Sequence, residues 1–460
     1  MNRTKYPWLF DLLFLLVLVL AGYLRLTGVD WGEGQGQHPD ENTFSGVLGA
    51  IRAQTCIDET LAVDACPLEQ RRWLSPGEYF NSQTSPLNPY NRGYGSFVYG
   101  NLPMNLIRVV VDASGQGDQR LFGRQASAFA DLFAIFFLYL LVARLYDRRV
   151  ALLAALFSSL AVMQIQQAHF FTTDLFVNTF AFLAIYFVVE ILKSEHQPDA
   201  APLTVRSVLS NPLFQYSLGF GVAYGMALAS KLNIYPLAVL LPGAFAVRWL
   251  MQQRKSRSVD GEQAAAESEA APASFPAEAW LIILTCLVAG GFAAILSFRI
   301  FQPYAFDGLK PDPRWVADIT QQRAQATGEA DMPWNLQWAR RSHLYSFTNM
   351  TVWGLGLPLG ILAWIGFLYM GWRILKGEWQ HALLWGWTAA YFGWQSLQFN
   401  PTMRYQLPIY PLLAMMAAWV VFEWLTPTTS HGPRSTFGRL RSWGAALIGL
   451  TVLILTAAWA

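Results

Sequence analysis

The 460-residue chain has few charged residues for its length. Charged side chains make up 13% of it, whereas a soluble domain carries about 25%. Hydrophobic residues make up 54%, and many gather in apolar runs of about 20 residues, the length that a helix needs to cross a bilayer. The shortage of charge excludes an ordinary soluble domain. It predicts an all-α protein that crosses the lipid bilayer several times.

Several common signatures are also missing from the sequence. It contains no Walker-type glycine-rich loop, no HExxH pair and no GxSxG elbow, which excludes ATP-driven pumping and the common hydrolase mechanisms. The net charge of +2 is spread along the chain instead of forming one basic face, so we expect no nucleic-acid partner.

Cysteine is scarce, with three residues in the whole chain. Cys56 and Cys66 share the first long loop, and Cys286 lies in an apolar run. If that loop faces an oxidising compartment, Cys56 and Cys66 can form a local disulfide. The alternative is a pair of free thiols in a loop that faces the cytosol.

The apolar runs predict about eleven spans, and the basic residues between them predict their orientation. Lysine and arginine gather in alternate short loops, which places the N-terminus on the cytoplasmic side. With an odd number of spans, the C-terminus then lies outside. The membrane is expected to be the cell (plasma or inner) membrane. The predicted spans are 7–27, 121–143, 149–168, 172–192, 212–230, 232–250, 279–298, 352–372, 381–399, 405–425 and 441–460.

Two long loops then face outside, within a single membrane domain over 1–460. The loop 28–120 is rich in acids, and its second half is typical of helices that lie along the membrane interface. The loop 299–350 is rich in tryptophan and arginine. By contrast, the inner loop 252–279 has the low-complexity composition of a disordered linker.

The run QHPDENT at 37–43 opens the first external loop and places an imidazole beside two acids. Pro39 favours an extended His38, and apolar residues at helical spacing follow Asp40. Two interpretations of Asp40 remain open at this point. It is either the N-cap of the helix that follows or a general base at a pocket that faces the membrane surface.

Further polar residues gather at the predicted outer ends of spans, where they are costly and therefore informative. Each has a structural alternative: a helix cap for Asp174, a satisfied interfacial histidine for His169, a snorkelling lysine for Lys231 and an anchor for Arg404. The complete set is Gln164, Gln166, Gln167, His169, Asp174, Lys231, Arg299, Gln302, Tyr304, Arg404 and Tyr405.

Carboxylates and cations at one membrane surface suit the transfer of a group from a phosphorylated lipid. Guanidinium and ammonium groups neutralise a lipid-linked phosphate, and a carboxylate opposite takes the proton of an attacking hydroxyl. Lys231, Arg299 and Arg404 are the candidate phosphate ligands. His38, His169, Gln302, Tyr304 and Tyr405 are the other candidate pocket residues.

Four motifs resemble those of the GT-C glycosyltransferases, in particular the phospholipid-carrier-dependent group that includes protein O-mannosyltransferases and the lipid A aminoarabinose transferase. They are Asp40-Glu41 after the first span, QQAHFFTTD at 166–174, FRIFQPY at 298–304 and RYxxPxxP at 404–411.

The resemblance implies a GT-C-like bundle, a polyprenyl-phosphate-linked sugar donor, an active site on the outer face and inversion at the anomeric carbon. The external acceptor would be a protein hydroxyl or a glycolipid. The resemblance gives the role of base to Asp40, with Glu41 beside it. It gives Asp174 the role of orienting the acceptor or, with Asp40, of holding a divalent cation such as Mg²⁺ or Mn²⁺.

The sequence therefore predicts a membrane glycosyltransferase. Two alternatives are a transporter or flippase for lipid-linked sugars and an inactive assembly partner that keeps the fold. A flippase would be expected to show inverted repeats and charges near the bilayer midplane, and the sequence shows no clear repeat.

Overall fold

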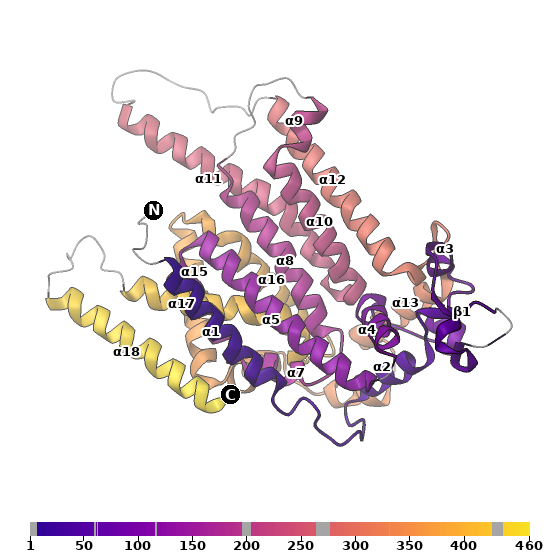
Figure 1. The fold of residues 1–460 in the computed structure, drawn as a ribbon. Coiled ribbons are helices and arrows are strands. Elements are labelled where there is room, and N and C mark those ends of the chain that lie inside the picture. The colour runs from indigo at the N-terminus through magenta and orange to yellow at the C-terminus, as the bar shows by residue number, and fades with distance from the viewer. Residues whose placement is uncertain are drawn as a thin grey trace.

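A computed structural model describes residues 7–58, 61, 63–115, 117–195, 204–263, 277–330, 332–425 and 436–460. Long helices form a bundle, and a smaller lobe lies at one end of it (Figure 1). The bundle helices are α1 (Pro7–Leu26), α5 (Gln119–Leu145), α6 (Arg148–Ser159), α7 (Val162–Ala168), α8 (Asp174–Lys193), α10 (Pro212–Ser230), α11 (Leu240–Gln263), α12 (Ala277–Phe301), α15 (Leu357–Leu375), α16 (Ala382–Ser396), α17 (Tyr410–Leu425) and α18 (Thr436–Trp459). Short 3₁₀ helices lead into α11 and α17: η4 (Leu232–Val239) and η9 (Met403–Ile409).

Every predicted span overlaps one helix of this bundle, except 149–168, which covers the pair α6 and α7. Within the described residues, seven helices are long and apolar enough to cross a membrane, or eight if α6 and α7, bent by 58° at their junction, count as one broken span. The predicted number of about eleven is higher because three helices are weaker candidates. α16 has only 15 residues, and the apolar part of α18 is short. In α10, polar and small residues lower the hydropathy.

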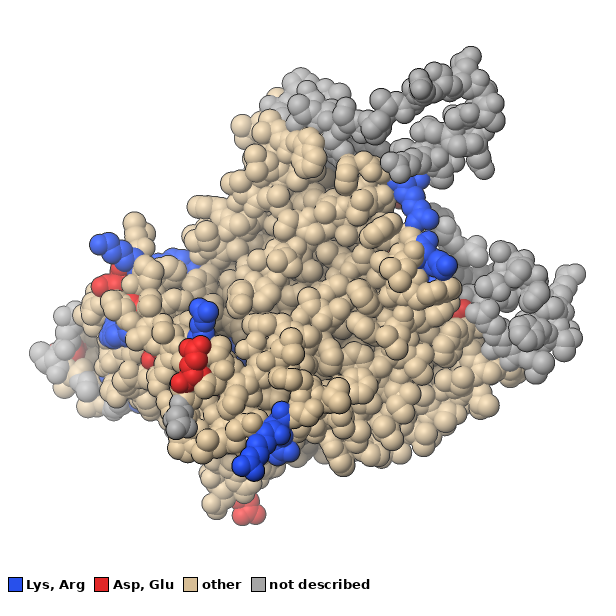
Figure 2. Space-filling model, turned by 180° about the vertical axis from the view of Figure 1, so that it is seen from behind, with Lys and Arg blue, Asp and Glu red and all other residues tan. Residues whose placement is uncertain are grey.

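The surface of the bundle confirms that this is a membrane protein with several spans. Large apolar side chains on α12 point outward, among them Phe292 and Ile295, which are 66% and 67% exposed. Figure 2 shows charged side chains near the edges of one face and a broad uncharged area between them. Such an area is costly in water and favourable in lipid.

Small residues bring α10 and α12 into close contact. A Cβ added at Gly221 would lie 2.1 Å from the Gly290 carbonyl oxygen, and one at Gly225 would lie 2.5 Å from the Ala294 carbonyl oxygen. Glycine at these positions lets the two backbones approach, as is common between membrane helices. The packing brings the end of α10, next to Lys231, close to the end of α12.

The two long loops predicted to lie outside meet in the lobe. The first contributes α2 (Pro39–Ala50), β1 (Gln54–Cys56), β2 (Arg71–Trp73), α3 (Pro76–Phe80) and α4 (Asn101–Ser114). The second contributes β3 (Phe306–Asp307), β4 (Lys310–Pro311), α13 (Pro313–Thr327), η6 (Pro333–Trp338) and α14 (Leu344–Asn349). Asp318 of the second loop joins them, because its carboxylate accepts hydrogen bonds from the Tyr90 hydroxyl at 2.5 Å and the Phe97 N–H at 2.8 Å.

The strands of the lobe are short antiparallel pairs. β1 pairs with β2, with Gln54 opposite Trp73, and β3 pairs with β4. A disulfide joins Cys56 to Cys66, with 5.8 Å between the Cα atoms, and closes the chain between β1 and β2. The sequence left two possibilities for these cysteines, a disulfide or two free thiols, and the structure contains the disulfide.

The predicted linker 252–279 is helical at both ends in the structure. α11 extends to Gln263, α12 begins at Ala277, and residues 264–276 lie outside the described residues.

Candidate active site

The first turn of α2 carries the two acids of the 37–43 run. His38 is the N-cap of this helix, and its Nδ1 accepts a hydrogen bond from the Glu41 N–H at 3.3 Å. Pro39 occupies the first helical position, and Phe44 of the same helix is fully buried in the core. Because His38 caps the helix, the Asp40 side chain is not needed for this role and extends toward the bundle.

Asp40 binds two partners. Its Oδ2 lies 2.5 Å from Arg404 Nη1, and its Oδ1 accepts a hydrogen bond from the Tyr99 hydroxyl at 3.1 Å. Burial raises the pKa of Asp40, but the charge and hydrogen bond of Arg404 outweigh burial and hold this pKa below its ordinary value. Burial and the negative charge of Asp40 raise the pKa of Tyr99, so that its hydroxyl stays a hydrogen-bond donor.

A second ion pair lies beside the first. Lys231, at the C-terminal end of α10, places its Nζ 2.6 Å from Asp174 Oδ1 at the start of α8. The Tyr405 ring contacts both cations: Lys231 Nζ lies 4.4 Å and Arg404 Cζ 5.5 Å from its centroid. The positive charge of Arg404 also acts on Asp174.

We call Asp40, Asp174, Lys231 and Arg404 the charge cluster. Its members come from four separate segments of the chain, namely α2, α8, the end of α10 and η9, yet they interact as two adjoining ion pairs. The Asp40 and Arg404 side chains are 26% and 21% exposed, so a ligand can reach them. The cluster thus offers two carboxylates and two cations at the end of the bundle that carries the lobe.

Glu41 has a different position from its neighbour. Its side chain is fully buried, and its oxygens bind Arg124 Nε at 2.7 Å and Nη2 at 2.8 Å. Glu41 Oε1 also accepts a hydrogen bond from the Phe171 N–H at 2.9 Å. Gly123 leaves room for this arrangement, since a Cβ there would lie 2.2 Å from the Phe171 ring. Glu41 therefore joins α2 and α5 to the segment at Phe171. This segment leads directly into Asp174, which belongs to the second ion pair.

The two predicted pocket histidines have different surroundings. The His38 ring lies 4.4 Å from the Phe170 ring, and burial followed by the charge of Arg404 lowers its pKa. His169 has contacts with main-chain carbonyl oxygens, from Nδ1 to Ile165 at 2.8 Å and from Nε2 to Thr27 at 2.9 Å. This environment matches the structural alternative for His169.

The three candidates at the end of α12 contact other parts of the lobe. The Arg299 guanidinium lies 5.0 Å from the Phe80 ring and 5.1 Å from the Phe306 ring, and within the described part of the chain it makes no contact with the charge cluster. The Tyr304 hydroxyl lies 2.9 Å from Ser85 Oγ, and Gln302 Oε1 accepts the Asn101 N–H at 2.5 Å. The structure therefore brings Lys231 and Arg404 together and places Arg299 among aromatic rings elsewhere.

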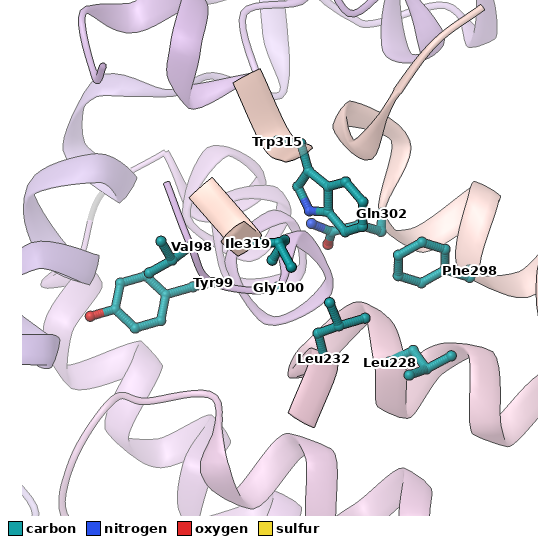
Figure 3. Close-up of a pocket in the computed structure, with 9 residues that line it drawn as sticks. All are labelled: Val98, Tyr99, Gly100, Leu228, Leu232, Phe298, Gln302, Trp315 and Ile319. Carbon is teal, nitrogen blue, oxygen red and sulfur yellow. The ribbon is translucent and has the colours of Figure 1, made fainter. Parts of the chain in front are cut away.

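A pocket lies next to the charge cluster, between the two helices packed by glycines and the lobe. Figure 3 shows Gln302 and Trp315 side by side on one wall and Tyr99 at the opposite end, with its hydroxyl directed away from the pocket. This hydroxyl is the group that binds Asp40. The empty space is about 210 Å³, part of which is open to solvent. The lining residues are Val98, Tyr99, Gly100, Leu228, Leu232, Phe298, Gln302, Trp315 and Ile319.

Sequence reasoning missed Tyr99 and Arg124. Tyr99 lies in an aromatic, glycine-rich stretch of the first loop, where no local pattern separates it from its neighbours. Arg124 did leave a signal, because an arginine within a predicted span requires a buried partner. The sequence offers many acids for that role, and only the structure selects Glu41.

No family model and no curated protein sequence matches the chain, but solved structures share its fold. The oligosaccharyltransferase AglB from Archaeoglobus fulgidus, in complex with an inhibitory peptide and a dolichol-phosphate, matches with a TM-score of 0.57 and 16% identity. The match covers 99% of this chain and 56% of AglB, so the chain spans just over half the length of that protein.

A second similar structure is ArnT from Cupriavidus metallidurans bound to undecaprenyl phosphate, with a TM-score of 0.53 and 15% identity over 98% of this chain and 75% of ArnT. At such identities the similarity shows the fold. The predicted architecture is confirmed: this chain has the polytopic GT-C membrane fold that AglB and ArnT share.

Proposed function

We propose that the protein is a membrane glycosyltransferase that moves a sugar from a polyprenyl-phosphate-linked donor to an external acceptor, with inversion at the anomeric carbon. The observation that carries the proposal is the charge cluster, two adjoining carboxylate–cation pairs at one end of an apolar bundle. The shared fold supports the proposal, because ArnT was solved with undecaprenyl phosphate and AglB with a dolichol-phosphate.

In the proposed reaction Asp40 takes the proton from an acceptor hydroxyl, and the hydroxyl oxygen forms a bond to the anomeric carbon. The bond from that carbon to the phosphate oxygen breaks at the same time, and polyprenyl phosphate leaves with the electron pair. Arg404 and Lys231 neutralise the charge on the departing phosphate. A protein hydroxyl or a glycolipid supplies the acceptor oxygen.

Arg404 connects donor binding to the base. In the structure it is paired with Asp40, which keeps that carboxylate ionised and weakens it as a proton acceptor. A phosphate offers the guanidinium two oxygens in the geometry that arginine prefers, so donor binding draws Arg404 away from Asp40. We propose that Asp40 becomes a stronger base when the donor is bound.

A divalent cation at Asp40 and Asp174 is part of the proposal. The described residues contain no group of three or more histidines, cysteines or acids arranged for a metal ion. Mg²⁺, however, is commonly held by one or two carboxylates together with substrate phosphates, and these two acids fit that donor set. The ion would neutralise charge on the leaving phosphate. It would compete with Lys231 and Arg404 for the carboxylates of Asp174 and Asp40. Chelation with EDTA, followed by addition of Mg²⁺ or Mn²⁺, tests this part: full activity in EDTA would remove the metal from the proposal.

We propose that the N-terminus lies in the cytoplasm and that the charge cluster faces outside, because lysine and arginine gather in alternate short loops. The flippase alternative receives little support from the buried charges of the bundle. Arg25 and Asp131 are fully buried and bound to each other at 2.6 Å, so they line no path for a substrate.

The proposed function is tested with purified protein in lipid nanodiscs. Polyprenyl-phosphate sugars are supplied with a hydroxyl-bearing peptide or a glycolipid, and the release of polyprenyl phosphate and the mass of the acceptor are followed together. Transfer to an acceptor with release of polyprenyl phosphate supports the proposal. Movement of intact donor across the bilayer without cleavage would instead identify a flippase.

A further inference from the structure

Two packing contacts hold Tyr99 beside Asp40. The Tyr99 ring lies 4.6 Å from the ring of Phe44, which is fully buried on α2. The next residue, Gly100, packs against the end of α10, where an added Cβ would lie 2.1 Å from the Ala229 carbonyl oxygen. Figure 3 shows the Tyr99 hydroxyl directed away from the pocket, and this hydroxyl donates to Asp40 Oδ1 at 3.1 Å. The side chain is therefore fixed at both its ring and its backbone.

The two oxygens of the Asp40 carboxylate have partners of different kinds. Oδ2 pairs with Arg404, and the proposed reaction has this guanidinium move to the donor phosphate. Oδ1 accepts from Tyr99, which has no charge to draw it toward a phosphate. Burial raises the pKa of Tyr99, so its hydroxyl keeps the proton that it donates. Donor binding therefore frees Oδ2 and leaves Oδ1 in its hydrogen bond.

We infer that Tyr99 is the positioning residue of the base, and that Oδ2 of Asp40 is the atom that takes the proton from the acceptor hydroxyl. The inference rests on the proposed function, which it deepens by assigning the proton to one oxygen. With the proton on Oδ2, Oδ1 becomes a carbonyl oxygen and still accepts from Tyr99. Tyr99 itself neither gives nor takes a proton. The acceptor hydroxyl then approaches from the side that Arg404 occupies in the structure.

Tyr99→Phe tests the inference, because it keeps the ring and removes the hydrogen bond. The freed carboxylate can rotate away from the acceptor, so kcat should fall about tenfold, with a change of less than about twofold in the KM for the donor. A hydrogen bond to the ionised form lowers the pKa of a carboxyl group, so its loss should move the acid limb of kcat to higher pH. A stronger base alone would transfer the proton faster. A lower plateau together with a raised acid limb therefore indicates lost positioning.

Other groups around Asp40 are charged or titrate, and the measurement must separate them from it. Arg404 and Lys231 are cations, and Asp174 is a second carboxylate that pairs with Lys231. The pKa of His38 is lowered below 6.5 by burial and Arg404, so His38 titrates close to the acid limb. The profiles are therefore measured between pH 4 and 8 in a His38→Asn background, in which asparagine keeps the helix cap.

Tyr90→Phe is the matched control. It also removes a tyrosine hydroxyl that donates to a carboxylate of the lobe, in this case Asp318, which lies outside the charge cluster. A general loosening of the lobe would affect both variants alike, whereas we expect the acid limb to move in Tyr99→Phe alone. The assay follows sugar transfer to a hydroxyl-bearing peptide by purified protein in lipid nanodiscs.

A difluorotyrosine in place of Tyr99 provides a second variant with the opposite expectation. Fluorine keeps the ring and the hydroxyl and makes the hydroxyl a stronger donor, so the acid limb should move to lower pH. If Tyr99→Phe does not fold, this variant decides: a limb at lower pH supports the inference, and an unmoved limb overturns it.

The remaining results separate the inference from the proposed function. If Tyr99→Phe keeps the kcat and the acid limb of its background while sugar is transferred, the inference is wrong and the glycosyltransferase stands. A higher kcat in Tyr99→Phe would also overturn the inference, because the hydroxyl would then compete with the proton for Oδ1. If wild-type protein transfers no sugar from any polyprenyl-phosphate donor, the proposed function fails, and the assignment of the proton to Oδ2 fails with it.

Discussion

Arg404 Nη1 lies 2.5 Å from Asp40 Oδ2, although 364 residues separate the two in the sequence. The contact joins the first helix of the lobe to a 3₁₀ turn at the start of a late span. It pairs the residue proposed as base with the residue proposed to hold the donor phosphate. Substitutions at Asp40 and at Arg404 separate these two roles.

Asp40→Asn should slow sugar transfer at least about a hundredfold, because it removes the proton affinity of the side chain and changes its size little. The fold should remain, since His38 caps α2. The measurement is the initial rate at saturating donor, with donor binding determined separately. Asp11→Asn is the control, because this carboxylate is 64% exposed and pairs with Arg148 instead of the charge cluster. A near wild-type rate in Asp40→Asn would move the base to Asp174.

Arg404→Lys should raise the KM for the donor by about tenfold or more and change kcat much less. Lysine keeps the charge but loses the planar pair of donors that fits a phosphate, and this loss affects binding first. Steady-state kinetics with varied donor provide the measurement, and Arg323→Lys, exposed on α13, is the control. A fall in kcat at constant KM would show that Arg404 acts mainly in the chemical step.

The sequence predicted α2, Asp40 and the bundle because their signals are local. Apolar spacing identified the helix that buries Phe44, and membrane-length runs identified the spans. The roles of Asp40 and Glu41 could not be separated, because neighbouring helical residues point about 100° apart and the sequence does not show which direction meets Arg404. Likewise, Arg299 and Arg404 both stand at span ends, and only the packing shows that Arg299 lies between Phe80 and Phe306.

The pKa of His38 predicts how stability depends on pH. Burial and Arg404 lower this pKa below 6.5, so below pH 6.5 the unfolded chain binds more protons than the folded protein. The contribution of His38 is therefore fully present above pH 6.5 and is lost as the pH falls through the lowered value. Protonation of Nδ1 also breaks the cap hydrogen bond to the Glu41 N–H. The pKa of Asp40 is also lowered, and its contribution is lost only below its ordinary value of 3.8, so the two windows are separate.

Melting temperatures between pH 4 and 8 test this prediction in wild type and His38→Asn. Asparagine also caps helices but does not titrate in this range. We expect wild type to lose stability below about pH 6.5 more steeply than His38→Asn. Parallel curves for the two proteins would contradict the role given to His38.

The disulfide provides a test of orientation. In a Cys286→Ala background, Cys56 and Cys66 should react with a membrane-impermeant maleimide on whole cells only after reduction, because the disulfide joins them in a lobe that we propose faces outside. Replacing both with serine should destabilise the lobe by up to about 3 kcal/mol, since the cross-linked loop is short. Labelling without reductant would show that Cys56 and Cys66 are free thiols. Labelling only in permeabilised cells would show that the lobe faces the cytoplasm.

The buried pair of Arg25 and Asp131 should be far more sensitive to substitution than an exposed ion pair of the bundle. Both side chains are fully buried, and Arg25 also donates to the Ser159 carbonyl at 3.0 Å, where α6 ends before the bend to α7. Asp131 Oδ1 accepts a hydrogen bond from Gln164 Nε2 of α7 at 3.0 Å. The Arg25–Asp131 pair therefore contacts both halves of the broken span.

Asp131→Ala should therefore cost about 3–5 kcal/mol, because it leaves the Arg25 guanidinium buried without its counter-charge. Asp11→Ala, which breaks the exposed pair with Arg148, is the matched control and should cost about 1 kcal/mol or less. Thermal unfolding of both variants in one detergent gives the comparison. Asp131→Leu with Arg25→Met removes both charges together and should recover much of the loss, since an apolar pair of similar size leaves no buried charge. Equal melting temperatures for Asp131→Ala and Asp11→Ala would mean that water reaches Arg25, and that the broken span does not depend on this ion pair.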